Sequence, residues 1–527
     1  MSNVIIGGGI SGLYLAYELS KNNDASKISI YEKTPRLGGR VYTKKNTITY
    51  DIGAGRFAYT HKYILTLINE LKLNDKILPI PSKNHYYIDN KYIRSDKKLL
   101  EHFNIRKYRS LHEIWQNVFK MADKKSIDYM NKVSVETFIK EHLGENICKL
   151  LKFKVGYNSK FSTTKAITAL NALKNDYGIL GGKHFVFLGG AEIMIDELTK
   201  ILTQRGCKIY LNHEVSSIDY KNKNVTVMHS DKSKEVTYDN IIFSTDMHGL
   251  QKIQNIPLSK KVLNSVKSSP LMRIYAVYPK KDGKIWFDDI YKVNTDLDIQ
   301  FIIPIDKKNG LIMISYTTDS NAEIWNNISS EDELNHKIEE SLQTIFPSKH
   351  IPKPNYLKTH FWRFGVHNWN LNADISSVNS ELLKHEKKNI FVAGEMFSNH
   401  HAWVEGGLQS VQSILPRIKF SNGNQKIKTS ITKTQTLESK LPFISKKELH
   451  KHNTSESLWS VLKHSREKIM YVYDLTEWQK THPGGAMAIL SIGGKDGTEK
   501  FMNNPVHNIE KIEDNILTKY RIGILKK

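Results

Sequence analysis

The chain has 527 residues with a formal net charge of +23, and 39% of its residues are hydrophobic. This length exceeds a single hydrophobic core and predicts two or three domains, while the composition excludes a disordered chain. Cys148 and Cys207 are the only cysteines, too few for a disulfide framework, which favours a reducing compartment. The lysines are spread along the chain rather than clustered, so we expect no specific nucleic-acid binding.

No apolar run reaches the roughly 18 residues that a membrane-spanning helix needs. Only Met-Ser-Asn precedes the first predicted strand at 4–7, and no signal peptide fits ahead of it. We therefore expect a soluble, cytoplasmic protein with no membrane span.

The first predicted element is a nucleotide-binding turn. Residues 4–12 read VIIGGGISG, in which an apolar strand leads into Gly7, Gly9 and Gly12. In a G-x-G-x-x-G turn the first glycine permits the bend, the second lets backbone approach a pyrophosphate, and the third lets a helix pack closely on the strand. A helical pattern follows, and the next strand, KISIYE, ends on Glu32, where a carboxylate holds ribose hydroxyls. This order predicts a dinucleotide bound at a helix N-terminus.

Two further motifs narrow the nucleotide to FAD. Gly39 and Arg40 follow the acid, and the Arg40 guanidinium offers a fork for phosphate oxygens. The segment DIGAGRF at 51–57 contains Gly55 and Arg56, and its glycines let the chain pass close to a flat ring.

The amino-terminal part resembles the flavin-containing amine oxidase family, whose members begin with a glycine turn and a Gly-Gly-Arg motif. The resemblance continues in FVFLGGAEIMIDELTKIL at 185–202 and in NIFVAGEMFSNHHAWVEGGLQSVQSIL at 389–415. It implies three sets of FAD contacts, namely the ribityl or pyrophosphate with Gly394 and Glu395, the adenine with Val215, and the pyrimidine end of the ring with Val404.

The same resemblance implies the fold class of residues 1–418. We expect an α/β Rossmann-type FAD-binding domain interleaved with an α+β substrate domain. The FAD-binding pieces would be about 1–80, 185–250 and 385–418, and the substrate pieces about 81–184 and 251–384.

The chain departs from the family pattern at one position near the flavin. Many members hold a lysine close to the flavin N5 nitrogen, and the matching stretch SSPLMRIYAVYPKK places Arg273 or Met272 there. This difference predicts a slower reaction with O2. Monoamine oxidases attach their flavin to a cysteine that has no counterpart in WRFGVHN at 362–368, so we expect FAD to be non-covalent.

Aromatic residues are the candidates for the substrate cavity. Trp362, His367 and Trp403 are predicted to form its walls, because rings that face a flavin hold a flat or cationic substrate. No catalytic base is assigned, since hydride transfer from a C–H bond needs no strong side-chain base. The basic stretch 81–184 disfavours cationic polyamines and suits carboxylated substrates.

Residues 419–440 are polar and lack apolar periodicity, which predicts a flexible linker at 419–443. Residues 444–527 resemble cytochrome b5 from end to end and predict a small α+β haem domain with Trp459 as its core aromatic. By this resemblance His482, in the run His-Pro-Gly-Gly, and His507 are the axial ligands of a b-type haem. Two imidazoles fill both axial positions, which favours electron transfer over oxygen activation.

Taken together, the motifs predict an FAD-dependent oxidoreductase that takes a hydride from a C–H/C–N substrate, with haem b as electron relay. The predicted partners are a small-molecule substrate and O2 or a redox partner. Two alternatives stay open: a protoporphyrinogen oxidase or polyene desaturase, and a non-catalytic electron carrier that binds flavin and haem.

Overall fold

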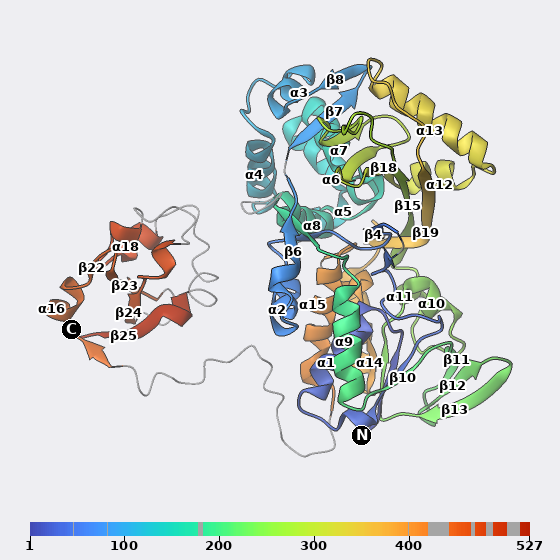
Figure 1. The fold of residues 1–527 in the computed structure, drawn as a ribbon. Helices are drawn as coiled ribbons and strands as arrows, with labels where there is room; N and C mark the ends of the chain where they lie inside the picture. The colour runs from blue at the N-terminus through green and yellow to red at the C-terminus, as the bar shows by residue number, and fades with distance from the viewer. Residues whose placement is uncertain are drawn as a thin grey trace. The chain divides into compact units, whose positions relative to one another are not determined.

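The structure is a computed structural model that describes residues 1–45, 47–81, 83–177, 183–398, 400–419, 442–464, 469–480, 489–502 and 517–526. The chain divides into two compact units, Met1–Ile427 and Lys428–Lys527 (Figure 1). Each unit has its own hydrophobic clusters. The mixed helix and strand content of both units agrees with the predicted α/β and α+β classes.

A five-stranded parallel sheet forms the part of the larger unit that contains the glycine turn. Its order is β10 (Lys208–Tyr210), β2 (Ile28–Tyr31), β1 (Asn3–Ile6), β14 (Asn240–Phe243) and β20 (Ile390–Val392). Both faces of β1 are buried, as expected for an apolar run in a parallel sheet. Beside the sheet lie three long helices, α1 (Ile10–Ser20), α9 (Ile193–Gln204) and α15 (Val404–Ile414) (Figure 1).

Shorter elements surround this sheet. The helices are α2 (Lys62–Glu70), α10 (Met247–Lys252), α11 (Lys260–Leu263) and α14 (Ile375–Glu386). Strands β11 (Glu214–Asp219), β12 (Asn224–His229) and β13 (Lys232–Thr237) form an antiparallel sheet. Two small sheets consist of β3 (Thr43–Lys45) with β4 (Thr49–Asp51), and of β5 (Phe57–Ala58), β9 (His184–Phe187) and β6 (Ile77–Pro79).

A seven-stranded mixed sheet forms the other part of the same unit. Its order is β19 (Tyr356–Trp369), β15 (Val266–Val277), β18 (Leu311–Thr318), β17 (Phe301–Asp306), β16 (Lys292–Thr295), β7 (Asn84–Ile88) and β8 (Lys91–Ile93). It is accompanied by α12 (Asp319–Asn326), α13 (Glu331–Ile345) and a helical group of α3 (Asp96–His102), α4 (Leu111–Ala122), α5 (Ile127–Lys132), α6 (Val135–Leu143), α7 (Glu145–Val155) and α8 (Ala166–Tyr177).

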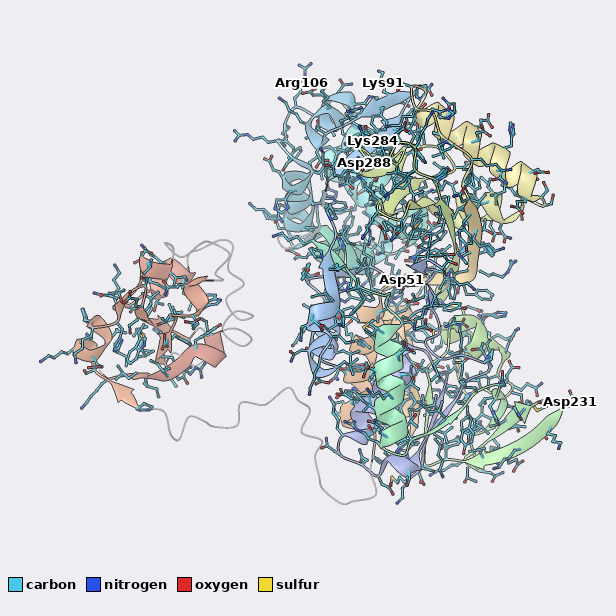
Figure 2. The ribbon with its side chains drawn as sticks, in the orientation of Figure 1. Asp51, Lys91, Arg106, Asp231, Lys284 and Asp288 are labelled. Atoms are coloured by element: carbon cyan, nitrogen blue, oxygen red, sulfur yellow. The ribbon has the colours of Figure 1, made fainter. Side chains whose placement is uncertain are left out.

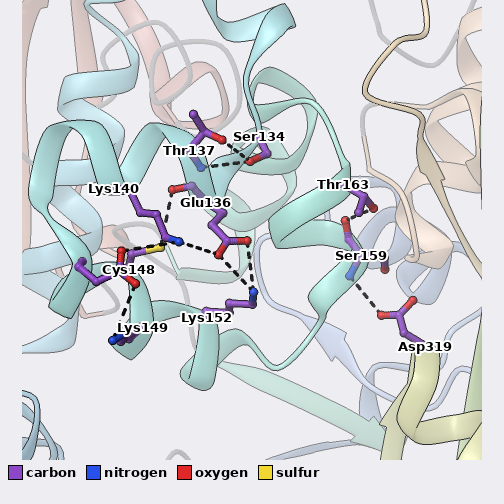
Figure 3. Close-up of polar contacts among 11 residues, drawn as sticks. Ser134, Glu136, Thr137, Lys140, Cys148, Lys149, Lys152, Ser159, Thr163 and Asp319 are labelled. Carbon is purple, nitrogen blue, oxygen red and sulfur yellow. Dashed lines mark hydrogen bonds and ion pairs between the residues drawn. The ribbon is translucent and has the colours of Figure 1, made fainter.

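The segment between α7 and α8 is a short π-helix, Ser159–Thr163, that polar contacts hold against its neighbours (Figure 3). The Ser159 backbone N–H donates to the Asp319 carboxylate at 3.1 Å, at the start of α12. Nearby, Glu136 of α6 forms ion pairs of 3.2 Å with both Lys140 and Lys152. The hydrogen bond to Asp319 ties the start of the segment that contributes Lys160 to the cavity described below.

The smaller unit contains a five-stranded sheet with the order β21 (Phe443–Ile444), β25 (Arg521–Leu525), β24 (Met470–Asp474), β23 (Ser457–Lys463) and β22 (Asn453–Thr454), together with helices α16 (Lys446–His450) and α18 (Thr498–Met502). In β23 the alternation of the strand buries Leu458 and Leu462 in the main cluster. Trp459 therefore lies on the opposite face, stacked on His452 and only partly buried. The prediction of Trp459 as the core aromatic is corrected accordingly.

The predicted ligands His482 and His507 lie outside the described residues, as does most of the predicted linker at 419–443. Within the described part of the chain, no helix has both the length and the apolar character needed to cross a membrane.

Candidate active site

A cavity of about 420 Å³ lies where β1 and β2 end and where α1 and α15 begin. We call it the glycine-lined cavity. The residues predicted to bind FAD that line it are Gly7, Gly9, Glu32, Gly39, Arg40, Gly394, Glu395 and Val404. The motifs at the two ends of the amino-terminal resemblance thus meet at one cavity.

The glycines of this cavity have two different functions. Gly7 has a φ of +106°, and a Cβ there would lie 2.5 Å from the Ser244 carbonyl oxygen, so only glycine fits the turn. By contrast, a Cβ on Gly9 would meet nothing nearer than Gly39 Cα at 4.0 Å, and one on Gly394 nothing nearer than the Thr245 oxygen at 3.9 Å. A side chain added at either of these two positions would instead occupy the cavity, which is the space that a ligand needs.

The backbone of the cavity is also suited to an anion. The N-caps of α1 and α15, Gly9 and Trp403, provide no side-chain hydrogen bond to the first turn of their helices. Free N–H groups and the positive end of a helix dipole attract phosphate and other negative groups. The residues present therefore fit the diphosphate and the electron-accepting ring of FAD.

Glu32 is held firmly at the edge of this cavity. One carboxylate oxygen accepts the Gly8 N–H at 2.8 Å, and the other accepts the Thr34 N–H at 2.9 Å and the Thr34 hydroxyl at 2.7 Å. The acid thus ties the glycine turn to the end of β2. Its position in the lining fits the predicted contact with a ribose.

A buried charge cluster lies at the other end of the lining. The Glu395 carboxylate accepts hydrogen bonds from Arg40 Nη1 at 2.7 Å and from the Ala402 N–H at 3.0 Å, and it lies 2.5 Å from His367 Nδ1. Burial raises the pKa of Glu395, but the charges of His367 and Arg40 outweigh this effect and hold the pKa well below its usual range. Glu395 is therefore ionised at neutral pH.

The three predicted wall residues have different positions. Trp362 lines the glycine-lined cavity and donates its indole N–H to the Ile52 carbonyl at 2.7 Å. Trp403 lines this cavity and a second one. His367 is fully buried against Glu395, while its neighbours Val366 and Asn368 line the second cavity. Because successive side chains of a strand point to opposite faces, His367 lies behind the wall.

Other predicted residues are placed as follows. Met272 is buried in the core of the seven-stranded sheet, whereas Arg273 faces both cavities. Gly12 is a packing position, since a Cβ there would lie 2.1 Å from the Gly7 carbonyl oxygen. Val215 is buried among apolar side chains and is not part of the described lining. Gly55 lines the second cavity.

The second cavity has a volume of about 790 Å³ and carries a surplus of positive charge. We call it the cationic cavity, because its lining includes Arg56, Lys160 and Arg273. Tyrosine and tryptophan rings complete its walls, and the Arg56 guanidinium lies 5.5 Å from the Trp403 ring centroid. Sequence analysis missed Lys160, and the basic character of stretch 81–184 was the only signal for it.

The two carboxylates of the cationic cavity are occupied by other groups. Asp51 lies between the two sheets (Figure 2) and accepts the Thr43 hydroxyl at 2.6 Å and the Ala191 N–H at 2.9 Å. Asp306 accepts the Asn309 side-chain amide at 2.6 Å and its backbone N–H at 3.1 Å. The lining holds three cationic side chains against these two carboxylates, so an anion is the better electrostatic match for this cavity.

The two cavities share part of their lining, which we call the junction. Its members are Ala54, Arg273, Tyr316, Val366, Ala402, Trp403 and Val404. A group bound in one cavity would thus face a group bound in the other across these residues. Such an arrangement brings an electron acceptor and a small molecule together.

Residues 10–412 match the family model for flavin containing amine oxidoreductases, and the chain belongs to that family. Residues 445–526 match the model for the cytochrome b5-like heme/steroid binding domain. The larger unit is thus an FAD-dependent oxidoreductase by family, and the two families imply FAD and haem as the cofactors. This outcome confirms the resemblance that the motifs predicted.

Individual proteins match different parts of the chain. The L-amino-acid oxidase of Vipera ammodytes ammodytes is 22% identical over 77% of this chain and 90% of its own length. An uncharacterized protein of Acanthamoeba polyphaga mimivirus is 23% identical over 42% of this chain and 49% of its own length. The nitrate reductase [NAD(P)H] of Betula pendula is 36% identical over 20% of this chain, and the matched segment covers only 10% of that enzyme.

Proposed function

We propose that the protein oxidises an amine that also bears a carboxylate, and that a b-type haem in the smaller unit relays the electrons. The observation that carries this proposal is the junction, where a cavity fit for FAD adjoins a cavity lined by Arg56, Lys160 and Arg273. When bound, FAD supplies an acceptor for two electrons and a hydride.

The residues of the chain bind and orient the substrate in this proposal. Arg56 and Lys160 hold the carboxylate through charge-assisted hydrogen bonds, and Trp403 provides an apolar wall against which the reacting carbon lies. Holding that carbon in one orientation lowers the entropic part of the barrier. The similarity to L-amino-acid oxidases supports this substrate class.

The proposed domain organisation follows from the same assignment. FAD-binding pieces of Rossmann type lie at about 1–80, 185–250 and 385–418, and the substrate-binding pieces at about 81–184 and 251–384. The parallel order of β10, β2, β1, β14 and β20 supports the Rossmann-type assignment.

The proposed haem site contains His482 and His507 as axial ligands. A flavin accepts electron pairs and a haem iron accepts single electrons, so the haem unit would convert a pair into two single steps. The linker predicted at 419–443 would allow repeated encounters of the two units at a high effective concentration. O2 or a redox partner is the final acceptor in this scheme.

One observation favours a second candidate, a protoporphyrinogen oxidase. The cationic cavity combines a volume of about 790 Å³ with aromatic walls, which also suits a large flat molecule with carboxylate groups. The positive side chains of its lining, Arg56, Lys160 and Arg273, disfavour a cationic polyamine.

Anaerobic absorption spectra of the purified protein test these alternatives. We expect amino acids to bleach the oxidised flavin band, while polyamines leave it unchanged. Bleaching by protoporphyrinogen but not by amino acids would establish the second candidate. Bleaching by polyamines alone would overturn the proposal.

A further inference from the structure

The junction contains one side chain that can exchange a proton at neutral to alkaline pH. Arg273 stays protonated in proteins, and the remaining members other than Tyr316 are apolar or carry only an indole N–H. Tyr316 is therefore the titratable group that both cavities share. It was not found by sequence analysis, because nothing in SYTTDS distinguishes it from an ordinary strand tyrosine.

Tyr316 lies on β18, directly opposite Arg273 on the neighbouring antiparallel strand β15. Directly opposite residues point to the same face of a sheet, and the Arg273 guanidinium lies 5.0 Å from the Tyr316 ring centroid. The Tyr157 and Phe301 rings each lie 6.1 Å away. The ring is thus held in place by packing against Arg273, Tyr157 and Phe301.

Positive groups surround the Tyr316 hydroxyl. Burial raises the pKa of Tyr316, but the charges of Arg273 and Arg56 and a hydrogen bond from Tyr157 outweigh burial and lower the pKa below its ordinary value. Tyr275, which lies on the neighbouring strand β15, shows the opposite behaviour, since burial raises its pKa to about 12. Its hydroxyl donates to the Asp51 carbonyl at 2.5 Å.

We propose that Tyr316 is the catalytic acid–base residue that accepts a proton from the substrate ammonium group. In its ionised form Tyr316 is a phenolate; an ammonium N–H bond breaks, an O–H bond forms on that phenolate oxygen, and the freed nitrogen lone pair can then stabilise the carbon that loses its hydride. The transfer moves one proton and no electrons. This role rests on the proposed function, because it needs an amine substrate.

The first test measures the titration of Tyr316 without any reaction. Ultraviolet difference spectra of the apoprotein between neutral and alkaline pH record tyrosinate formation in wild type, Y316F and a control, Y238F. Tyr238 is also buried, its hydroxyl has no hydrogen-bond partner among the described residues, and burial raises its pKa to about 12. We expect Y316F, and not Y238F, to lose a tyrosine whose pKa lies below the ordinary tyrosine value. An unchanged curve for Y316F overturns the proposal.

The second test measures anaerobic flavin reduction by an amino acid as a function of pH. General acid–base catalysis typically contributes about 10²–10⁴-fold, so we expect Y316F to be at least about 100-fold slower at neutral pH. The deficit should shrink at high pH, where the substrate amine is already neutral, and Y238F should follow wild type.

The outcomes separate the two proposals. If no amine reduces the wild-type flavin, the proposed function is overturned, and the role of Tyr316 falls with it. If wild type is reduced and Y316F is equally fast at every pH, only the role of Tyr316 is overturned. A deficit that is the same at all pH values indicates a purely structural function of the hydroxyl and also overturns the role.

Discussion

Gly9 offers a substitution that separates cofactor binding from folding. Its φ of −71° and ψ of 173° suit any residue, and a Cβ there would meet no atom of the chain nearer than 4.0 Å. An alanine at a compatible glycine position adds about 0.4–1 kcal/mol of stability through the unfolded state. We therefore expect G9A apoprotein to unfold at the same temperature as wild type or slightly above it.

The effect of G9A on FAD binding should have the opposite sign. A methyl group placed in a filled site costs about 1–3 kcal/mol by overpacking, and about 1.4 kcal/mol is tenfold in Kd. The Kd for FAD should thus rise roughly 5- to 150-fold. Titration of apoprotein with FAD, followed by flavin fluorescence, measures the Kd, and circular dichroism measures the unfolding temperature.

The matched control is G12A. A Cβ on Gly12 would lie 2.1 Å from the Gly7 carbonyl oxygen within the fold itself, so this variant should lower the unfolding temperature of the apoprotein. The assignment of the glycine-lined cavity to FAD would be refuted if G9A bound FAD with the same Kd as wild type. It would also be refuted if the unfolding temperature of G9A fell as much as that of G12A.

Four other substitutions have expected outcomes. E395Q leaves Arg40 without its buried partner and should lower the free energy of unfolding by about 3–5 kcal/mol. Because the pKa of Glu395 is depressed in the folded protein, its carboxylate stabilises the fold at neutral pH and less so in acid. Thermal melts should therefore show the full loss at neutral pH and a smaller loss below about pH 4.3. K154M should stabilise the protein at pH 7 by at most about 3 kcal/mol, because burial lowers the pKa of Lys154 to about 8 and thus opposes its charged form. The wild type should regain this stability as the pH rises from about 8 to 10.4. Thermal melts of both proteins across this pH range measure the difference. R56A should raise KM for a carboxylated amine at least about tenfold in steady-state assays, whereas K91A, which changes an exposed lysine (Figure 2), should not. H482A should lose the haem spectrum and keep substrate-dependent flavin bleaching.

Parts of the site are predictable from sequence because their geometry is local. The glycine turn, the acid that ends β2 and the helix that begins at Val404 are each specified by a few neighbouring residues. In such motifs the spacing itself fixes which backbone groups face the ligand. The motifs at 4–12 and 389–415 could therefore be assigned to one cofactor before the structure placed them at one cavity.

Other parts of the site depend on pairings between distant segments. Tyr316 and Arg273 face each other through the register of β18 on β15, and Lys160 joins them from the segment before α8. No local pattern records such a meeting. His367 illustrates a related difficulty, because a shift of one residue along a strand moves a side chain from the cavity to the opposite face.

The orientation of Trp459 in the smaller unit has the same origin. A strand that alternates Leu458, Trp459 and Ser460 can bury either set, and here the leucine face lies toward the main cluster. The large aromatic residue suggested the other choice. Tertiary packing overrides the preference of a single side chain for the core.

In the proposed function, electrons from an amine pass through the flavin to the haem of the same chain. Anaerobic rapid mixing of the full chain with an amino acid, recorded over the flavin and haem absorption bands, tests it most directly. We expect flavin bleaching to come first and haem reduction to follow at a rate independent of protein concentration. Haem reduction that is absent, or that slows on dilution, would contradict an intramolecular relay.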